Sequence, residues 1–273
     1  MTKVTKIEWV QNQDGSKGKT WNPMTGCTKI SPGCKYCYAE RLAKRLQAME
    51  VKGYENGFEL TLHEERLKHP FNRKKATTYF VNSMSDLFHE QVPDDFIEKV
   101  FHVIQQSPQH TFQILTKRAE RMVDFFKTHH APKNAWLGVS IEDRKYGLPR
   151  IDRLRQVDAQ IRFLSMEPLL EELGELDLSG IHWVIVGGES GADARPMAHE
   201  WVTHIREQCQ AAGVPLFIKQ MGSDWARTHH SKSMKGNDMS EWSEDLRVRG
   251  YPLCEHQHGV LNFTTTGIDK DKP

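Results

Sequence analysis

From about residue 78 onward, short apolar runs rich in β-branched and aromatic residues alternate with longer segments of helical period. This alternation is typical of repeated βα units, in which successive strands run parallel. We expect helices at 94–106, 119–127 and 199–212, and a first strand that ends near Trp21. The later expected strands are Thr78 to Asn82, Thr111 to Leu115, Ala135 to Val139, Ile161 to Leu164, His182 to Val186 and Pro215 to Lys219.

A parallel sheet built from such units either closes into a barrel or opens into a doubly wound sheet. The spacing of the elements does not separate these two folds. The 273 residues are enough for one large α/β domain, which we expect over residues 1–222 with an insertion at about 51–75. Residues 223–273 are expected to form a C-terminal extension or lid of the same domain.

Composition indicates the class of protein but not its partner. The formal net charge is +1, so no overall field draws the chain toward nucleic acid or an anionic membrane. No run is long and apolar enough to span a bilayer or resemble a signal peptide, so we expect a cytoplasmic protein without a membrane partner. Five cysteines, three of them clustered, do not resemble a secreted disulfide framework. Cys209 shares an apolar helical face and is expected to be a packing residue.

Polar residues follow every expected strand after residue 78. Because the carboxyl ends of parallel strands converge on one face, these residues together predict one polar pocket. Taken singly, each is equally well explained by the exposure of loops. The segments are NSMSD (82–86), TKR (116–118), SIE (140–142), SMEP (165–168), GGESG (187–191) and KQMG (219–222).

Cys27, Cys34 and Cys37 lie close together in a turn that leads into a helical segment, and three interpretations are open. Free structural cysteines rarely cluster in a turn rich in Gly and Pro. An iron-sulfur cluster held by only three thiolates leaves one iron open to a small molecule, which suits catalysis. A structural zinc ion needs a fourth ligand. The candidates for that ligand are His63, His69, Cys254, His256 and His258.

The run CKYCYAE is similar to the end of the radical S-adenosylmethionine motif, where an aromatic residue, here Tyr36, precedes the final cysteine. Further segments resemble a phage-associated three-cysteine family related to radical S-adenosylmethionine enzymes, over most of the chain. These segments are TWNPMTGCTKISPGCKYCYAERLAKRL, SMSDLFH, LTKR, GVSIE, SMEPLL, GGESG and KQMG. Two features depart from the usual radical-enzyme pattern. Six residues instead of three separate Cys27 from Cys34, and Gly-Gly-Glu follows a later strand at 187–189.

The resemblance implies a partial TIM-type barrel with a [4Fe-4S] cluster on Cys27, Cys34 and Cys37. It also implies that S-adenosylmethionine chelates the open iron through its amino and carboxylate groups. One electron, from a reductant such as flavodoxin or ferredoxin, then cleaves the sulfonium. The implied product is a 5′-deoxyadenosyl radical that abstracts a hydrogen atom from a substrate.

The resemblance also implies residues that contact S-adenosylmethionine. Serines and Asp86 after the second strand are expected at the methionyl amino group, residues of SIE at the ribose hydroxyls, and an aromatic ring near the adenine. Carboxylates suit ammonium and hydroxyl donors on chemical grounds alone. The expected cofactor-binding residues are Tyr36, Ser83, Ser85, Asp86, Ser140, Glu142 and Glu167.

Lys117, Glu189 and Lys219 remain as candidate catalytic residues for substrate or proton handling, a role that Glu167 also suits. Ion pairs at the strand ends are an equally open interpretation of all four.

Basic residues concentrate at 66–75, 144–155 and 227–235. Basic runs with neighbouring aromatic rings suit nucleic acid, but a solvated face balanced by acids explains each run at least as well. A nucleic acid or nucleotide substrate is therefore one hypothesis. A non-catalytic, zinc-stabilised nucleic-acid-binding module is the alternative from another functional class. The aromatic residues in question are Phe71, Tyr146 and Trp225.

Overall fold

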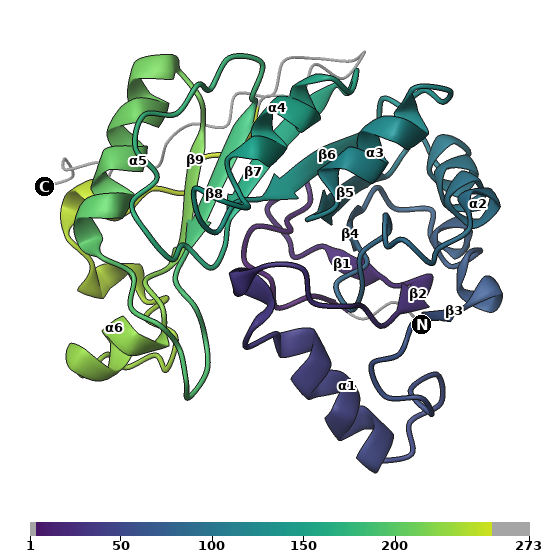
Figure 1. Ribbon diagram of the computed structural model, residues 1–273, viewed down its shortest axis with the longest axis horizontal. Helices are drawn as coiled ribbons and strands as arrows, with labels where there is room; N and C mark the ends of the chain where they lie inside the picture. The colour runs from purple at the N-terminus through teal and green to yellow at the C-terminus, as the bar shows by residue number, and fades with distance from the viewer. Residues whose placement is uncertain (1–3, 253–273) are drawn as a thin grey trace, which may run out of the picture.

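The computed structural model describes residues 4–252. Seven parallel strands form a curled half-barrel sheet, and helices cover its outer side (Figure 1). The strands of this sheet are β1 (Lys19–Trp21), β4 (Thr78–Val81), β5 (Thr111–Thr116), β6 (Ala135–Ser140), β7 (Ile161–Met166), β8 (Trp183–Gly187) and β9 (Leu216–Gln220). The helices are α1 (Tyr38–Ala48), α2 (Asp94–Gln105), α3 (Ala119–Phe126), α4 (Pro149–Arg155), α5 (His199–Ala212) and α6 (Ser223–Thr228). A separate antiparallel pair consists of β2 (Met24–Thr25) and β3 (Thr61–Leu62).

The order of the strands decides between the two folds that the sequence left open. The strands lie side by side in chain order, from β1 through β4 to β9. A doubly wound sheet reverses its strand order at a switch point, whereas sequential right-handed βα units keep their helices on one side. The structure therefore confirms the partial TIM-type barrel.

Each predicted strand is present within one or two residues of its expected bounds, and the three predicted helices correspond to α2, α3 and α5. The sequence analysis missed α4, α6 and the small β2–β3 sheet. Their lengths explain this, because α4 has seven residues, α6 has six and each strand of the small sheet has two. Such short elements show no measurable period.

A second, aromatic core fills the concave side of the half-barrel. Trp9, from the segment that precedes β1, contacts Phe80 edge to face at 4.9 Å between ring centroids. Trp9 also lies 5.9 Å from Trp183, whose indole nitrogen donates to the carbonyl oxygen of Gly250. The N-terminal segment thus helps to fill the concave side of the half-barrel.

The two segments outside the repeat both pack onto the sheet assembly. The segment 51–75 contains β3 and pairs with β2, directly before Cys27. Residues 248–250 return along the edge of β9, where the amide of Ile218 donates to Val248 and that of Gly250 donates to Leu216. The lid role of the C-terminal extension stays a prediction, and residues 253–273 lie outside the described part. None of the helices in residues 4–252 has the length and apolar character that crossing a bilayer requires.

Candidate functional site

A cavity of about 280 Å³ opens at the carboxyl ends of the parallel strands. Its floor is apolar and includes Ile7, Trp9, Phe80 and Leu115, and its walls carry the polar strand ends. Every predicted site residue except Glu142 lines this one cavity. These residues are Cys27, Cys34, Tyr36, Cys37, Ser83, Ser85, Asp86, Lys117, Ser140, Glu167, Glu189 and Lys219.

The three cysteines lie on a loop that crosses the top of the sheet. The amide of Cys27 donates to Phe58 at 3.2 Å, which ties this end of the loop to the segment before β3. Cys34 ends a short 3-10 turn, and Cys37 immediately precedes α1. At Gly33 the loop packs on the side chain of Glu142, because a Cβ there would lie 3.2 Å from three of its carbons. The longer spacing between Cys27 and Cys34 lets the loop reach across to the end of β6.

The donor set suits a cluster better than a single metal ion. Cys27, Cys34 and Cys37 are free, partly exposed thiols on the wall of one cavity. Within residues 4–252, no three His, Cys, Asp or Glu side chains are arranged to hold one metal ion. Each thiolate of a cubane cluster binds a different iron, so the sulfurs need to face a common space and not a common point. His63, a candidate fourth zinc ligand, instead contacts Thr25 at 2.9 Å.

Among the remaining candidate zinc ligands, His69 does not line the cavity, and Cys254, His256 and His258 lie outside the described residues.

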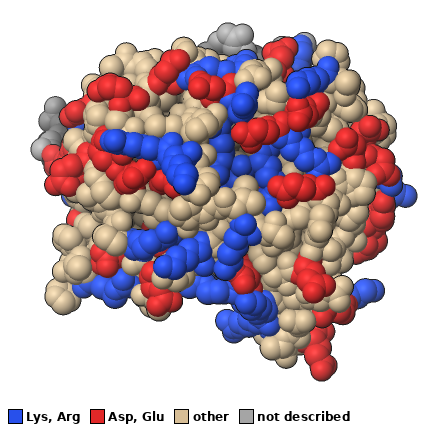
Figure 2. All heavy atoms as spheres, viewed as in Figure 1, with Lys and Arg blue, Asp and Glu red and all other residues tan. Residues whose placement is uncertain are grey.

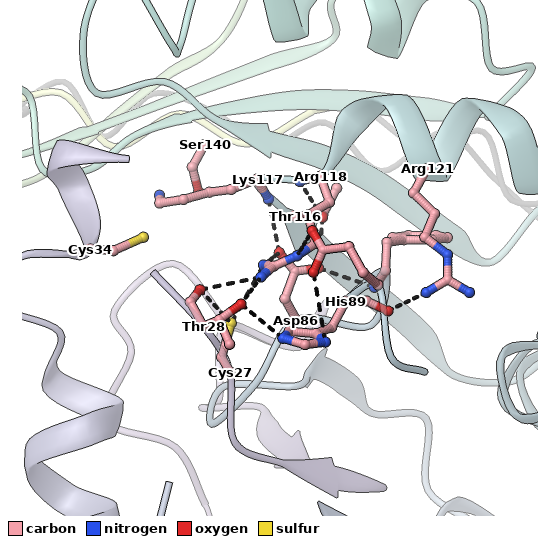
Figure 3. A network of polar contacts seen from close by, with 12 residues as sticks. Cys27, Thr28, Cys34, Asp86, His89, Thr116, Lys117, Arg118, Arg121 and Ser140 are labelled. Carbon is pink, nitrogen blue, oxygen red and sulfur yellow. Dashed lines mark hydrogen bonds and ion pairs between the residues drawn. The ribbon is translucent and has the colours of Figure 1, made fainter. Parts of the chain in front are cut away.

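Asp86 and Arg118 form a buried network beside Cys27 (Figure 3). The Asp86 carboxylate accepts bonds from the Thr116 hydroxyl at 2.7 Å, the Lys117 amide at 3.0 Å and Arg118 at 3.2 Å. Burial raises the pKa of Cys27 to about 12, and Asp86 adds to this effect while Arg118 opposes it. The Cys27 thiol is therefore protonated near neutral pH unless a metal displaces the proton.

The Lys117 side chain lies between the cavity and Glu142. Its ammonium is 3.8 Å from the Glu142 carboxylate, which also accepts from Arg150 at 2.6 Å. Burial opposes ionisation of Glu142, but Lys117 and Arg150 outweigh it and lower the pKa of this carboxyl. Glu142 is fully buried in this pair, whereas Ser140 faces the cavity. A contact between Glu142 and a ribose would require Glu142 to turn away from Arg150.

Glu167 and Lys219 form an ion pair on the opposite wall, at the ends of β7 and β9. The Lys219 ammonium lies 2.5 Å from Oε2 of Glu167. Burial would lower the pKa of Lys219, but the Glu167 charge and hydrogen bond outweigh it, so the pKa is raised and the ammonium stays charged. The second carboxylate oxygen, Oε1, is buried without a hydrogen-bond partner. Among the candidate site residues in the described part of the chain, only Glu167 has a buried side-chain polar atom without a hydrogen-bond partner.

Both carboxylate oxygens of Glu189, unlike those of Glu167, have hydrogen-bond partners. Arg195 donates to Glu189 from its backbone amide at 3.0 Å and from its guanidinium at 2.8 and 2.6 Å. The same guanidinium donates to Pro32 of the cysteine loop and lies 5.4 Å from the centre of the Tyr36 ring. The Glu189–Arg195 pair therefore fixes the cysteine loop against the end of β8.

Ser83 and Ser85 line the cavity, but their hydroxyls form hydrogen bonds with the segment around β2. The Ser83 hydroxyl bonds with the side-chain amide of Asn22, and that of Ser85 donates to Met24 at 3.1 Å. The Tyr38 hydroxyl donates to the carbonyl oxygen of Ser83. These bonds orient the segment after β4 toward the cysteines.

The sequence analysis missed Arg118, Arg195 and Trp9. Arg118 is adjacent to Lys117 in LTKR, and its burial at 5% exposure separates it from ordinary surface arginines. No periodicity marks Arg195, since its role depends on a loop that the fold brings back to Pro32. Trp9 lies in a segment without a repeat, and only the curvature of the sheet brings it to the cavity floor.

A family model described as a protein of unknown function, DUF5131, matches residues 4–246. The chain belongs to the DUF5131 family. The matched region includes every cavity residue named above. No curated protein matches this DUF5131 chain.

Solved structures similar to this DUF5131 chain include several of spore photoproduct lyase. A complex of that enzyme with a dinucleoside spore photoproduct is 12% identical, with a TM-score of 0.42. A mutant of it with bound AdoMet and the same dinucleoside is 14% identical, also with a TM-score of 0.42. In both comparisons the alignment covers 76% of this chain and 63% of the other, so the chain spans less than two thirds of their length.

Proposed function

We propose that this chain is a radical S-adenosylmethionine enzyme with a [4Fe-4S] cluster on Cys27, Cys34 and Cys37. The observation that carries the proposal is the convergence of three free, partly exposed thiols on one wall of a polar cavity. Three thiolates would leave one iron of a cubane without a protein ligand, and the cysteines that would hold the cluster line the cavity. A structural cluster would have no use for such an opening.

When bound, the cluster supplies one electron that cleaves the sulfonium of S-adenosylmethionine into methionine and a 5′-deoxyadenosyl radical. The chain orients the cofactor and excludes water. Asp86 is held in place by the Thr116 hydroxyl, the Lys117 amide and Arg118, and its carboxylate oxygens would accept from an ammonium group as a further partner. Ser83 and Ser85 shape the same wall, and Ser140 offers a hydroxyl to the ribose.

The Tyr36 ring supports the same assignment. Its centre lies 5.0 Å from the Lys35 ammonium and 5.4 Å from the Arg195 guanidinium, so the ring is held in place beside the cysteines. Such a ring offers a face on which an adenine can stack. Glu142 acts indirectly, because its pair with Arg150 holds the side chain on which Gly33 of the cysteine loop packs.

Glu167 and Lys219 are the proposed substrate-handling pair. The charged ammonium and the unpartnered Oε1 of Glu167 offer a donor and an acceptor at one point of the cavity. Such a pair can orient a substrate hydroxyl or amide and hold or release a proton at Lys219. Lys117 supplies a second ammonium on the facing wall. Glu189, engaged by three donors of Arg195, is a positioning residue in this scheme.

Anaerobic reconstitution with iron and sulfide tests the proposal directly. We expect a brown protein with about four irons and four sulfides per chain. Reduction by dithionite or by flavodoxin in the presence of S-adenosylmethionine should then release 5′-deoxyadenosine. A colourless protein that retains one zinc ion would instead support the non-catalytic module, and iron without 5′-deoxyadenosine would contradict the radical chemistry.

We further propose that the substrate is a nucleic acid or nucleotide. Lys and Arg side chains gather between α6 and α1 on the face drawn in Figure 2. Arg41 of α1 donates to Ser190, and Arg227 of α6 donates to Ala192 at 3.0 Å, so both flank the loop after β8 that lines the cavity. The Arg41 guanidinium donates there to a neutral carbonyl. Arg227 also pairs with Asp224 at 3.2 Å, but this pair is exposed and screened by water, so both residues keep positive charge available for phosphate.

The other predicted basic runs are less suitable. Within 144–155, Arg144 pairs with Glu172, Arg150 with Glu142, and Arg155 with Asp152. The run at 66–75 lies in the segment around β3 and does not line the cavity.

The salt dependence of binding to fluorescent single-stranded DNA tests the substrate class. Wild-type binding should weaken steeply with salt, and Arg41→Ala with Arg227→Ala should reduce the log–log slope by about 0.7 per lost phosphate contact. Arg144→Ala, whose guanidinium pairs with Glu172, is the matched control and should leave the slope unchanged. Absent or salt-insensitive binding by the wild type would remove nucleic acid as the substrate.

A further inference from the structure

All three guanidinium nitrogens of Arg118 donate hydrogen bonds close to Cys27, the first cysteine of the loop (Figure 3). One terminal nitrogen lies 3.4 Å from the Cys27 sulfur and 3.2 Å from Asp86. The other donates to the carbonyl oxygen and the hydroxyl of Thr28, at 3.2 and 2.9 Å, and Nε donates to Glu90 at 2.8 Å. The planar guanidinium thus contacts Cys27, Thr28 and two carboxylates at the same time. A lysine ammonium is too compact to reach all four.

The contact with Thr28 restrains the backbone at Cys27. His89 adds a second support, because its Nε2 lies 2.9 Å from the Thr28 hydroxyl. Nδ1 of His89 accepts from the Gln91 amide, so Nε2 carries the ring proton and donates to Thr28. The Thr28 hydroxyl therefore accepts from Arg118 and His89 together, and residues after β4 and β5 clamp the start of the cysteine loop.

Arg118 also carries a fixed positive charge beside a proposed cluster ligand. Its side chain is 4% exposed, so little water screens that charge. The added electron makes a cluster more negative, and both the net charge nearby and hydrogen bonds to sulfur set its reduction potential. Loss of the guanidinium would remove this positive charge and also leave the Asp86 carboxylate uncompensated. Both changes would lower the reduction potential of the cluster.

We infer that Arg118 is a positioning residue that clamps the Cys27 segment and makes the cluster easier to reduce. The inference rests on the proposed function for its second half only. The clamp exists in the protein before any cluster is inserted.

Amide hydrogen exchange of the full-length, cluster-free chain tests the clamp. The amides of Gly26 and Cys27 donate to Met84 and Phe58, and both bonds depend on the loop staying in place. Arg118→Met should raise their exchange rates about tenfold, while Val184 in the sheet keeps its rate and reports that the fold is intact. Arg155→Met is the control. Arg155 binds Asp152 and the carbonyl oxygen of Ser179, and it contacts neither the cysteine loop nor His89.

Redox titration of the reconstituted protein, followed by electron paramagnetic resonance, tests the charge. Arg118→Met should lower the reduction equilibrium constant about tenfold, which is about 59 mV for a one-electron couple. Arg118→Lys keeps the charge but cannot span Thr28 and Cys27 together. It should therefore raise amide exchange as Arg118→Met does, with a smaller change in potential.

The outcomes separate the inference from the proposed function. Wild-type exchange rates in Arg118→Met, or equal potentials in Arg118→Met and Arg155→Met, would overturn the role of Arg118. Failure of the wild type to bind iron would contradict the proposed function instead, and the exchange experiment would still decide whether Arg118 clamps the loop.

Discussion

Replacing Cys34 with Ala is expected to abolish retention of the iron-sulfur cluster, and Cys27→Ala and Cys37→Ala should do the same. A cubane that loses one of three thiolates keeps only two protein ligands. Iron and sulfide per chain, with the visible absorbance after anaerobic reconstitution, measure the effect. Production of 5′-deoxyadenosine should fall to background in each variant.

Cys209→Ala is the control for this series. Cys209 lies in α5, is 1% exposed and belongs to the core between this helix and the sheet. Its replacement should cost about 1 kcal/mol of unfolding free energy and leave the iron content unchanged. A full cluster in Cys34→Ala, or loss of the cluster in Cys209→Ala, would show that the assigned ligands are wrong.

Asp86→Asn is expected to destabilise the cluster-free protein by about 3–5 kcal/mol, because it breaks a buried ion pair and leaves Arg118 with only the exposed Glu90 as a charge partner. The amide nitrogen of Asn would also face groups that now donate to the carboxylate, among them the Thr116 hydroxyl and the Lys117 amide. Urea unfolding at neutral pH measures the difference.

Asp94→Asn makes the same chemical change at the surface. Asp94 pairs with Arg121 at 2.6 Å, but its side chain is 68% exposed, so the loss should not exceed about 1 kcal/mol. Equal effects of the two substitutions would mean that Asp86 is not the anchor of the buried network.

The sheet could be predicted from the sequence because its strands are buried on both faces and read as continuous apolar runs. Residues 183–186, for example, are fully buried in β8. The choice between a barrel and a doubly wound sheet could not be predicted from the spacing of these runs, and only the family resemblance implied the barrel. It depends on the order of the strands, which spacing along the chain does not encode.

The contents of the cavity were predictable because parallel strands end on one face, so polar residues far apart in the chain meet there. The partners of those residues were not predictable. Glu142 follows β6 as Glu167 follows β7, yet Glu142 turns to Arg150 on α4 and is withdrawn from the cavity. Lys117 was predicted as a site residue and Arg118 was not. The two are adjacent at the end of β5, and the sequence does not show which of them points into the buried network.

The binding of S-adenosylmethionine to the reduced cluster tests the central claim most directly. In the proposed site, three thiolates from Cys27, Cys34 and Cys37 would leave one iron to take the amino and carboxylate groups of that molecule. Its addition should therefore change the electron paramagnetic resonance signal of the reduced protein. A signal unaltered by saturating S-adenosylmethionine would mean that a fourth ligand closes the cluster, and would contradict the account.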